Sequence, residues 1–423
     1  MRRMAGLFLL VIVGAGVVYG VTVTRRESAY LDVIERGDAA LARDDSFAAI
    51  EAFTVAIALK SDSMLAHLKR GEAYRRRREF ESALRDLRRA SELDPLATQP
   101  RELLGDVNYA MGRYARATAQ YAEYTALDDR SPRLFYKLAL TSFQLGQVPA
   151  AIRALEKAVA LDDRFAEGHY LLGVCLRETQ QPDAALKSFL RAVKLQPALL
   201  QAREELADLY GRLGRPDERA RQLEALAALD PRASREVTLG LVYARSGQLD
   251  RAVTRLGSAA ERFPDAGYTY VALGRVWLER AAQGDRIELR KALGALEAAV
   301  GSDSSSEALT LLGRALLLSG DLARAEQILL QATTRFPVDV ESFYYLADVA
   351  DRRGHLPIAQ RALIDFASLE RVEAPKFDAR LLARLADAHL RSGDAAAARR
   401  AAERSLEKDP ANAAAKVVLA RAR

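Results

Sequence analysis

The segment from Ala166 to Leu199 reads AEGHYLLGVCLRETQQPDAALKSFLRAVKLQPAL. Its first half carries Leu172 and Gly173, and Ala185 follows Gly173 by twelve residues. Two antiparallel helices can approach closely only where the residues at their crossing are small, which suits the glycine and the alanine. Pro197 closes the segment, because proline has no backbone N–H with which to continue a helix. The segment therefore predicts two antiparallel helices joined by a short turn.

This pattern recurs along the chain at a nearly constant interval. Small residues in phase with Gly173 recur at an interval of 34 as Gly37, Gly71, Gly105, Ala139 and Ala207, followed at intervals of 33, 34, 39, 34 and 39 by Gly240, Gly274, Gly313, Ala347 and Ala386. The residues in phase with Ala185 are Ala49, Ala83, Ala117, Ala151, Ala252, Ala325, Ala359 and Ala398. One helix pair cannot bury both of its faces, so neighbouring pairs must stack into a continuous core. The sequence therefore predicts an all-α solenoid.

These residues resemble the tetratricopeptide repeat (TPR), which has this length, these small crossing residues and a closing proline. The resemblance covers Tyr30–Asn412 as eleven helix-turn-helix units, and residues 413–423 are predicted to form a closing helix. It implies a right-handed superhelix. It also implies a concave groove, lined by the first helix of each unit, that binds peptides of partner proteins.

The array is predicted to have two parts. Residues 30–232 keep the regular interval, whereas residues 233–412 are less regular. Arg219 stands where a crossing alanine is expected, and the next interval is one residue short. Extra residues fall at 281–288 and at 371–378. We interpret them either as tolerated variation in loop length or as loops that contact a partner.

Residues 1–28 are predicted to be a membrane anchor. The stretch Met4–Thr24 contains no charged residue and is bounded by Arg3 and Arg25. As a helix this run would be about 32 Å long at ~1.5 Å per residue, which is close to the ~30 Å hydrocarbon core of a bilayer. We favour an uncleaved signal-anchor. The alternative, a cleaved signal peptide, usually has a shorter apolar run.

The short basic N-terminus favours an N-in orientation of this single-pass anchor. The array would then lie on the periplasmic side of the inner (cytoplasmic) membrane of a bacterium. Gly16 and Gly20 form a G-x-x-x-G pattern, the spacing that lets two membrane helices approach closely. We interpret these two glycines either as a membrane-helix contact or as the ordinary glycine content of such spans.

The chain carries no recognisable catalytic or metal-binding motif. Cys175 is its one cysteine, which excludes an intramolecular disulfide and any CxxC site. His67, His169 and His389 occupy framework positions of the repeat, and His355 lies in a predicted turn with no second histidine or cysteine near it. No nucleophile elbow or phosphate-binding loop is found. The sequence therefore indicates a protein that is not an enzyme and that binds no cofactor or metal.

Much of the net charge of +6 arises in the second repeat, where nine basic residues stand against four acidic residues. We call these nine residues the basic patch: Lys69, Arg70, Arg75, Arg76, Arg77, Arg78, Arg85, Arg88 and Arg89. They are interpreted either as solvated helix ends, where basic residues are favourable, or as a contact for anionic lipid or polysaccharide. Nucleic acid is disfavoured, because only Tyr74 and Phe80 are interleaved with the basic residues.

Aromatic and aliphatic residues recur on the first helices of several repeats. Their i, i+4, i+7 spacing places them on one helical face, which we predict to line the concave groove. These residues are Tyr109, Tyr136, Leu140, Phe143, Tyr170, Val174, Val237 and Leu241. The alternative is that they pack between adjacent helices.

Together these features predict a membrane-anchored TPR scaffold or adaptor that binds one or more proteins or peptides. The membrane segment favours a role in cell-envelope assembly, secretion or export. The alternative is an envelope protein that binds a polyanion or polysaccharide through its basic second repeat.

Overall fold

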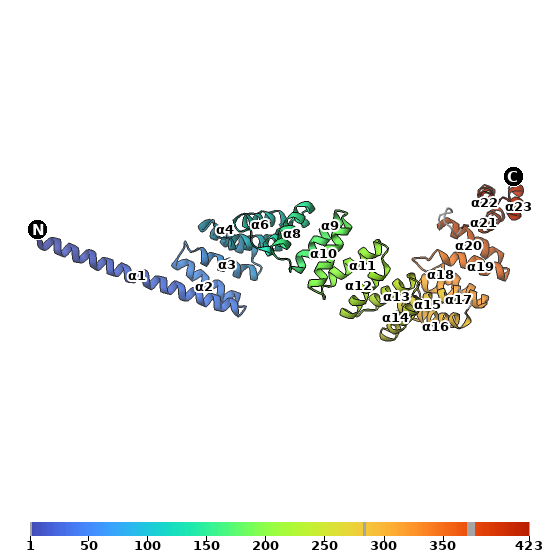
Figure 1. Ribbon diagram of the computed structural model, residues 1–423, viewed down its shortest axis with the longest axis horizontal. Coiled ribbons are helices and arrows are strands. Elements are labelled where there is room, and N and C mark those ends of the chain that lie inside the picture. The colour runs from blue at the N-terminus through green and yellow to red at the C-terminus, as the bar shows by residue number, and fades with distance from the viewer. Residues whose placement is uncertain (1, 282–284, 370–376, 423) are drawn as a thin grey trace. The chain divides into compact units, whose positions relative to one another are not determined.

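The computed structural model of the chain describes residues 2–281, 285–369 and 377–422, with side chains from residue 22 onward. The described residues form 23 α-helices and no β-strand, which confirms the predicted all-α fold. Helices α1 to α22 follow one another as eleven antiparallel pairs, and α23 closes the series (Figure 1). The number of repeats and the closing helix are therefore as the repeating pattern predicts.

The chain divides into two compact units, Met1–Leu206 and Ala207–Arg423, and the predicted division after residue 232 stays a prediction. Ten helices belong to the first unit: α1 (Arg2–Ala42), α2 (Ser46–Leu59), α3 (Met64–Arg76), α4 (Phe80–Leu93), α5 (Gln99–Ala110), α6 (Tyr114–Leu127), α7 (Pro132–Gln144), α8 (Val148–Leu161), α9 (Ala166–Glu178) and α10 (Pro182–Leu195). Helix α11 (Leu200–Arg212) contains the boundary. The helices of the second unit are α12 (Pro216–Leu229), α13 (Ala233–Arg245), α14 (Leu249–Arg262), α15 (Gly267–Ala281), α16 (Arg286–Ser302), α17 (Ser306–Ser319), α18 (Leu322–Ala332), α19 (Glu341–Arg353), α20 (Leu356–Leu369), α21 (Ala379–Arg391), α22 (Ala395–Lys408) and α23 (Ala413–Arg421).

Many helix pairs are held by a glycine that faces a large side chain of its partner helix. At Gly173 in α9, an added Cβ would lie 2.6 Å from Cε1 of Phe189 in α10, a residue that is fully buried. The same contact joins Gly105 to the ring of Tyr121, where the distance would be 2.3 Å. The crossing alanine Ala185 is also fully buried. The small residues therefore leave room for a ring or a leucine from the second helix, and this contact sets how closely the pair packs.

Local signals in the sequence set the ends of α7, which carries four of the nine residues of the candidate site. Oγ of Ser131 accepts a hydrogen bond from the backbone N–H of Leu134 at 3.3 Å, and Pro132 occupies the first turn. Both residues are typical of a helix start. The turn after the helix contains Gly146 with a φ of 72°, a left-handed conformation that glycine adopts without steric cost.

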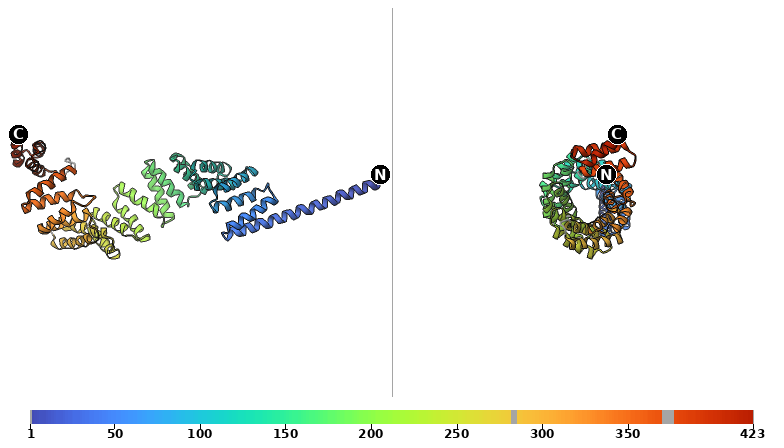
Figure 2. Two further views of the ribbon diagram at one scale, coloured as in Figure 1. Left: turned by 180° about the vertical axis from the view of Figure 1, so that it is seen from behind. Right: turned by 90° about the vertical axis from the view of Figure 1, so that its right-hand side faces the viewer.

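Helix α1 runs without a break from Arg2 to Ala42, over 41 residues. Its C-terminal part packs against α2, and Tyr30, Val33 and Ile34 are buried there. The N-terminal part of α1 projects beyond α2 (Figures 1 and 2). The sequence predicts a membrane segment followed by a separate first repeat, whereas the structure joins the two in one helix.

The predicted span Met4–Thr24 falls mainly in residues 1–21, whose side chains lie outside the described part of the chain. From residue 22 onward, no described helix combines the length and the apolar character that a membrane crossing needs.

The two predicted insertions fall partly outside the described residues. Of the first, residues 282–284 are not described, and Asp285 caps α16 by accepting a hydrogen bond from the backbone N–H of Ile287 at 2.7 Å. Helix α16 has 17 residues where most second helices have 14, so part of this insertion lengthens a helix. Of the second insertion, Phe377 and Asp378 are described, and the Phe377 ring stacks on Phe366 with centroids 5.3 Å apart.

In α12 the buried alanine lies one residue later than the repeat interval predicts, and Arg219 therefore stands at the expected alanine position. Ala220 is the buried alanine of α12, with 4% of its surface exposed, and Arg219 beside it is half-buried. The Arg219 guanidinium lies against Gly211, where an added Cβ would be 3.2 Å from Cζ. Arg219 therefore lies beside the buried alanine position instead of filling it.

The crossing contact leads to a stability prediction for Gly173→Ala. The new methyl group would overlap the buried Phe189 ring, and overpacking of this kind costs about 1–3 kcal/mol. Replacing glycine by alanine in a helix gains only roughly 0.5–1 kcal/mol. We therefore expect net destabilisation, measured as a lower urea midpoint of unfolding.

Gly257→Ala is the matched control. Gly257 lies inside α14 and has no heavy atom within 4 Å of an added Cβ, so only the helix propensity changes. This variant should be more stable than the wild type by roughly 0.5–1 kcal/mol. If both variants gain stability equally, the crossing glycines are not required by packing.

Candidate functional site

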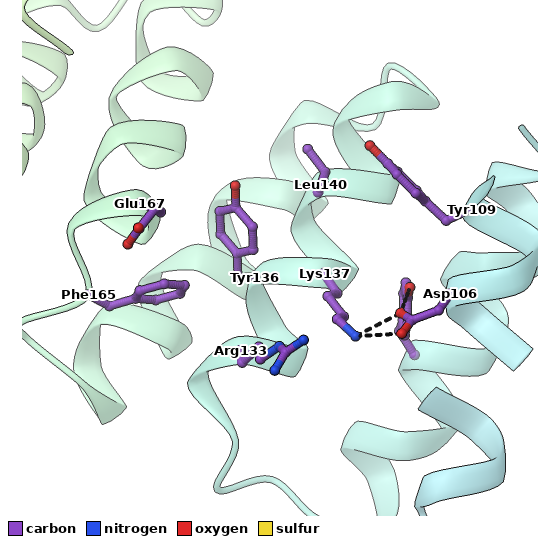
Figure 3. Close-up of a pocket in the computed structure, with 9 residues that line it drawn as sticks. Asp106, Tyr109, Arg133, Tyr136, Lys137, Leu140, Phe165 and Glu167 are labelled. Atoms are coloured by element: carbon purple, nitrogen blue, oxygen red, sulfur yellow. Dashed lines mark hydrogen bonds and ion pairs between the residues drawn. The ribbon is translucent and has the colours of Figure 1, made fainter. Parts of the chain in front are cut away.

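A pocket of about 420 Å³ opens on the first helices of three successive repeats in the first unit (Figure 3). Helices α5 and α7 and the start of α9 supply most of its lining, and one residue comes from α6. The lining residues are Asp106, Tyr109, Tyr121, Arg133, Tyr136, Lys137, Leu140, Phe165 and Glu167.

Aromatic rings form the walls of this pocket. The ring of Tyr136 meets the ring of Phe165 edge-on, with centroids 5.3 Å apart and an interplanar angle of 66°. This geometry is favourable for two aromatic rings. Figure 3 shows Tyr109 across the space from Tyr136, with Leu140 and the Lys137 side chain between them. The pocket therefore presents apolar surface on several sides.

A charged cluster lies at one edge of the pocket. Nζ of Lys137 lies 2.7 Å from Oε1 of Glu102 and 2.7 Å from Oδ1 of Asp106. The hydroxyl of Tyr121 donates a hydrogen bond to Oδ1 of Asp106 at 2.7 Å. Burial first, and then the Asp106 charge, raise the pKa of Tyr121, so this phenol stays protonated. Lys137 is thus neutralised within the fold and is a poor anchor for an anionic ligand.

Other polar groups of the pocket have no partner among the described residues. Arg133 and Glu167 are exposed, and neither forms an ion pair there. The hydroxyls of Tyr109 and Tyr136 form no hydrogen bond with the described residues either. Burial is the main cause that raises the pKa of Tyr136, so its hydroxyl is a hydrogen-bond donor at neutral pH. These groups can bind the polar parts of a ligand whose apolar part lies between the rings.

Three of the eight predicted groove residues line this pocket: Tyr109, Tyr136 and Leu140. Phe143 is half-buried further along α7. Tyr170 is half-buried as well. Its ring centroid lies 6.1 Å from the ring centroid of Phe189, a core residue of the same repeat.

The other three predicted groove residues differ in how much of their surface is exposed. Val174 is buried, with 8% of its surface exposed, so it packs between helices and presents little surface to a ligand. Val237 and Leu241 are half-buried on α13 in the second unit. Sequence reasoning missed the other six lining residues of the pocket, which are Asp106, Tyr121, Arg133, Lys137, Phe165 and Glu167. Arg133 stands three residues before Tyr136 on the same helical face, a spacing that could have identified it.

Most of the basic patch is paired with acidic side chains. Five of the nine residues form ion pairs: Lys69 with Asp38, Arg70 with Asp86, Arg76 with Glu72, Arg77 with Glu79, and Arg89 with Glu92. The Arg70 pair is bidentate, at 2.6 and 2.8 Å, and this hydrogen bonding raises the pKa of Arg70. Such pairing lowers the positive charge available to a polyanion.

The other four residues of the basic patch are Arg75, Arg78, Arg85 and Arg88, and none has an acidic partner among the described residues. Arg78 lies in the turn between α3 and α4 with a φ of 62°, where other repeats place glycine. It therefore has the position of a turn residue. Binding of anionic lipid or polysaccharide by the basic patch stays a prediction.

Gly16 and Gly20, the predicted membrane-helix contact, lie outside the residues whose side chains are described. Cys175 is fully buried, and burial raises the pKa of its thiol to about 11. His355 contacts a carboxylate, with Nδ1 lying 2.8 Å from Oε1 of Glu326. Within the described ranges, no group of three or more histidine, cysteine, aspartate or glutamate side chains could hold a metal ion.

Comparison with known proteins supports the repeat assignment. A family model for the tetratricopeptide repeat matches residues 68–132, 136–199, 237–285, 282–340 and 383–423. A curated relative, the small glutamine-rich tetratricopeptide repeat-containing protein 2 of Mycosarcoma maydis, is 31% identical over 109 residues. That match covers 26% of this chain and 31% of the relative, so the chain spans about a third of the relative's length.

Parts of this chain are also similar to solved structures. YrrB, described as a TPR protein with an unusual peptide-binding site, is 24% identical, with 43% of this chain and 94% of YrrB covered and a TM-score of 0.39. PilF of Pseudomonas aeruginosa is 20% identical, with 49% and 94% covered and a TM-score of 0.43. The family model matches more than half of the sequence, and the protein therefore belongs to the tetratricopeptide repeat family.

Proposed function

We propose that this protein is a membrane-anchored scaffold that binds a segment of a partner protein in the pocket on α5, α7 and α9. The observation that carries the proposal is the aromatic lining that three successive repeats contribute to one pocket of about 420 Å³. Pockets of about 300–1,000 Å³ with apolar walls and a few polar groups are typical of ligand sites. Members of the family generally mediate protein–protein interactions, which agrees with a peptide as ligand.

The lining indicates the chemistry of the bound segment. An aromatic or aliphatic side chain would lie between Tyr136 and Tyr109, where it loses contact with water. An acidic residue of the partner would pair with Arg133, and a basic residue would pair with Glu167. Because these two charges have opposite signs, they favour one direction of the bound chain over the reverse. Lys137 contributes its aliphatic stem, since its charge is satisfied by Glu102 and Asp106.

The proposed membrane attachment rests on Met4–Thr24 and on the continuity of α1. An uncharged run of this length can cross a bilayer as a helix. Since α1 continues from this run into the first repeat, no flexible linker would separate the repeat from the membrane. With the N-terminus inside, the array would lie in the periplasm of a bacterium. A partner held there would take part in cell-envelope assembly, secretion or export.

Tyr136→Ala should reduce binding without unfolding the array. The probe is the tightest ligand from a panel of synthetic ten-residue peptides with a central phenylalanine or leucine flanked by glutamate and lysine. Truncating an aromatic anchor commonly costs about 2 kcal/mol, so roughly a thirtyfold loss of affinity is expected. Fluorescence anisotropy measures the affinity, and Tyr136→Phe should retain most of it because the ring remains.

Tyr268→Ala is the matched control, since Tyr268 is an exposed tyrosine on α15 in the second unit. Its affinity should equal that of the wild type. Thermal unfolding of each variant is followed in parallel. If Tyr136→Ala loses binding only in proportion to the fraction unfolded, Tyr136 is a core residue and the pocket is not the binding site.

Membrane orientation gives a separate prediction. A reporter enzyme that is active only outside the cytoplasm, fused after Arg423, should be active in bacterial cells. Deleting residues 4–24 should abolish this activity and release the protein from the membrane fraction. Activity of a cytoplasm-specific reporter at the same fusion point would contradict the N-in orientation and would place the partners inside the cell.

A further inference from the structure

A second cleft, of about 800 Å³, opens in the second unit. Helices α19, α20, α21 and α23 line it. Its lining includes aliphatic residues, and two of these are well exposed, Leu356 at 44% and Val417 at 49%. Charged side chains of α19 and α21 also line it.

This cleft uses the same repeat positions as the aromatic pocket. In α7, Arg133 stands six residues before the crossing residue Ala139, and Arg380 in α21 stands six residues before Ala386. Lys137 and Arg384 each stand two residues before the same crossing residues. All four of these basic residues line their respective sites. The second unit therefore carries a site at the equivalent face of its last repeats, with α23 in the place that α9 has in the first unit.

The aromatic residues of the first site are replaced at the equivalent positions of the second. Counted from the crossing residues, Ala383 corresponds to Tyr136, Asp387 to Leu140 and Asp351 to Tyr109. Asn412 precedes α23 as Phe165 precedes α9. The lining of the cleft therefore has smaller or charged side chains where the first site has aromatic rings, and it also includes residues of α20.

The charges of the cleft leave arginine in excess. Three aspartates are paired: Asp348 with Arg352 at 2.9 Å, Asp351 with Arg384 at 2.5 Å, and Asp387 with Arg391 at 2.8 Å. Arg380 is exposed and has no acidic partner among the described residues. The side chains of Arg352 and Arg391 are 57% and 52% exposed, so their remaining N–H groups face solvent. Ion pairs of this exposed i, i+4 kind are weak, and a ligand can compete for them.

We infer that this cleft is a second binding site, and that it binds an acidic segment of a protein partner. Carboxylates of the segment would pair with Arg380 and with the outward N–H groups of Arg352 and Arg391, which suit bidentate contacts. Aliphatic side chains of the same segment would cover Leu356 and Val417. The inference does not depend on the proposed function, because the two sites share no residue and lie in different units.

The experiment uses the full-length protein in detergent and two labelled ten-residue peptides. One peptide alternates glutamate and leucine, and the other alternates lysine and leucine. Fluorescence anisotropy should detect binding of the acidic peptide only, with an affinity that falls as salt is raised from 50 to 500 mM, because exposed charges are screened. Arg380→Glu should lower this affinity at least tenfold, since the change replaces an attraction by a repulsion.

Arg400→Glu is the matched control, because Arg400 is exposed on α22 and does not line the cleft. It changes the net charge equally, and its affinity for the acidic peptide should stay within twofold of the wild type. The peptides are measured on Tyr136→Ala as well, which removes the ring of the first pocket, and Arg380→Glu should still lower the affinity at least tenfold in that background. The inference is overturned if the acidic peptide does not bind, if Arg400→Glu weakens binding as much as Arg380→Glu, or if Tyr136→Ala rather than Arg380→Glu abolishes it.

Discussion

The contact between a crossing glycine and a large side chain of the paired helix is the constraint on which the rest of the structure depends. Where Phe189 lies on Gly173, the two helix axes can approach closely, and the ring fills the space that a Cβ would otherwise occupy. The same arrangement joins Gly71 to Leu87 and Gly313 to Leu329. Close pairs present regular outer faces, so each pair can stack on the next and bury a continuous core. The first helices are thereby held side by side, and a shared pocket can form on them.

Polar contacts between successive repeats add to this stacking. Lys137 of one repeat pairs with Asp106 of the preceding repeat, and Arg384 pairs with Asp351 in the same sense. Exposed pairs of this kind typically contribute about 0.2–1 kcal/mol each. The Lys137 side chain is only 15% exposed, so its pair with Asp106 is less screened by solvent. This pair also fixes which charges of the first site remain available, since it leaves Arg133 and Glu167 for a ligand.

Much of the fold could be predicted from the sequence because the determinants of a repeat are local. Gly173, Ala185 and Pro197 mark a crossing and a helix end within a single repeat, and similar marks recur along the array. The site was less predictable, because a stripe on one helix does not define its rotation to within one residue. Val174 shares the stripe of Tyr170 and yet is buried. Phe165 belongs to the site only because α9 packs beside α7, a relation between repeats that no local spacing reveals.

The continuity of α1 has a geometric consequence for the first repeat. A helix advances about 1.5 Å and turns about 100° with each residue. Helix α1 has no loop between Arg2 and Ala42 that could compensate for an added or a removed residue. Each residue inserted or deleted near Arg26 would therefore rotate the first repeat by roughly 100° about the axis of the N-terminal segment. The number of residues in this stretch therefore determines the orientation of the first repeat relative to the N-terminal segment of α1.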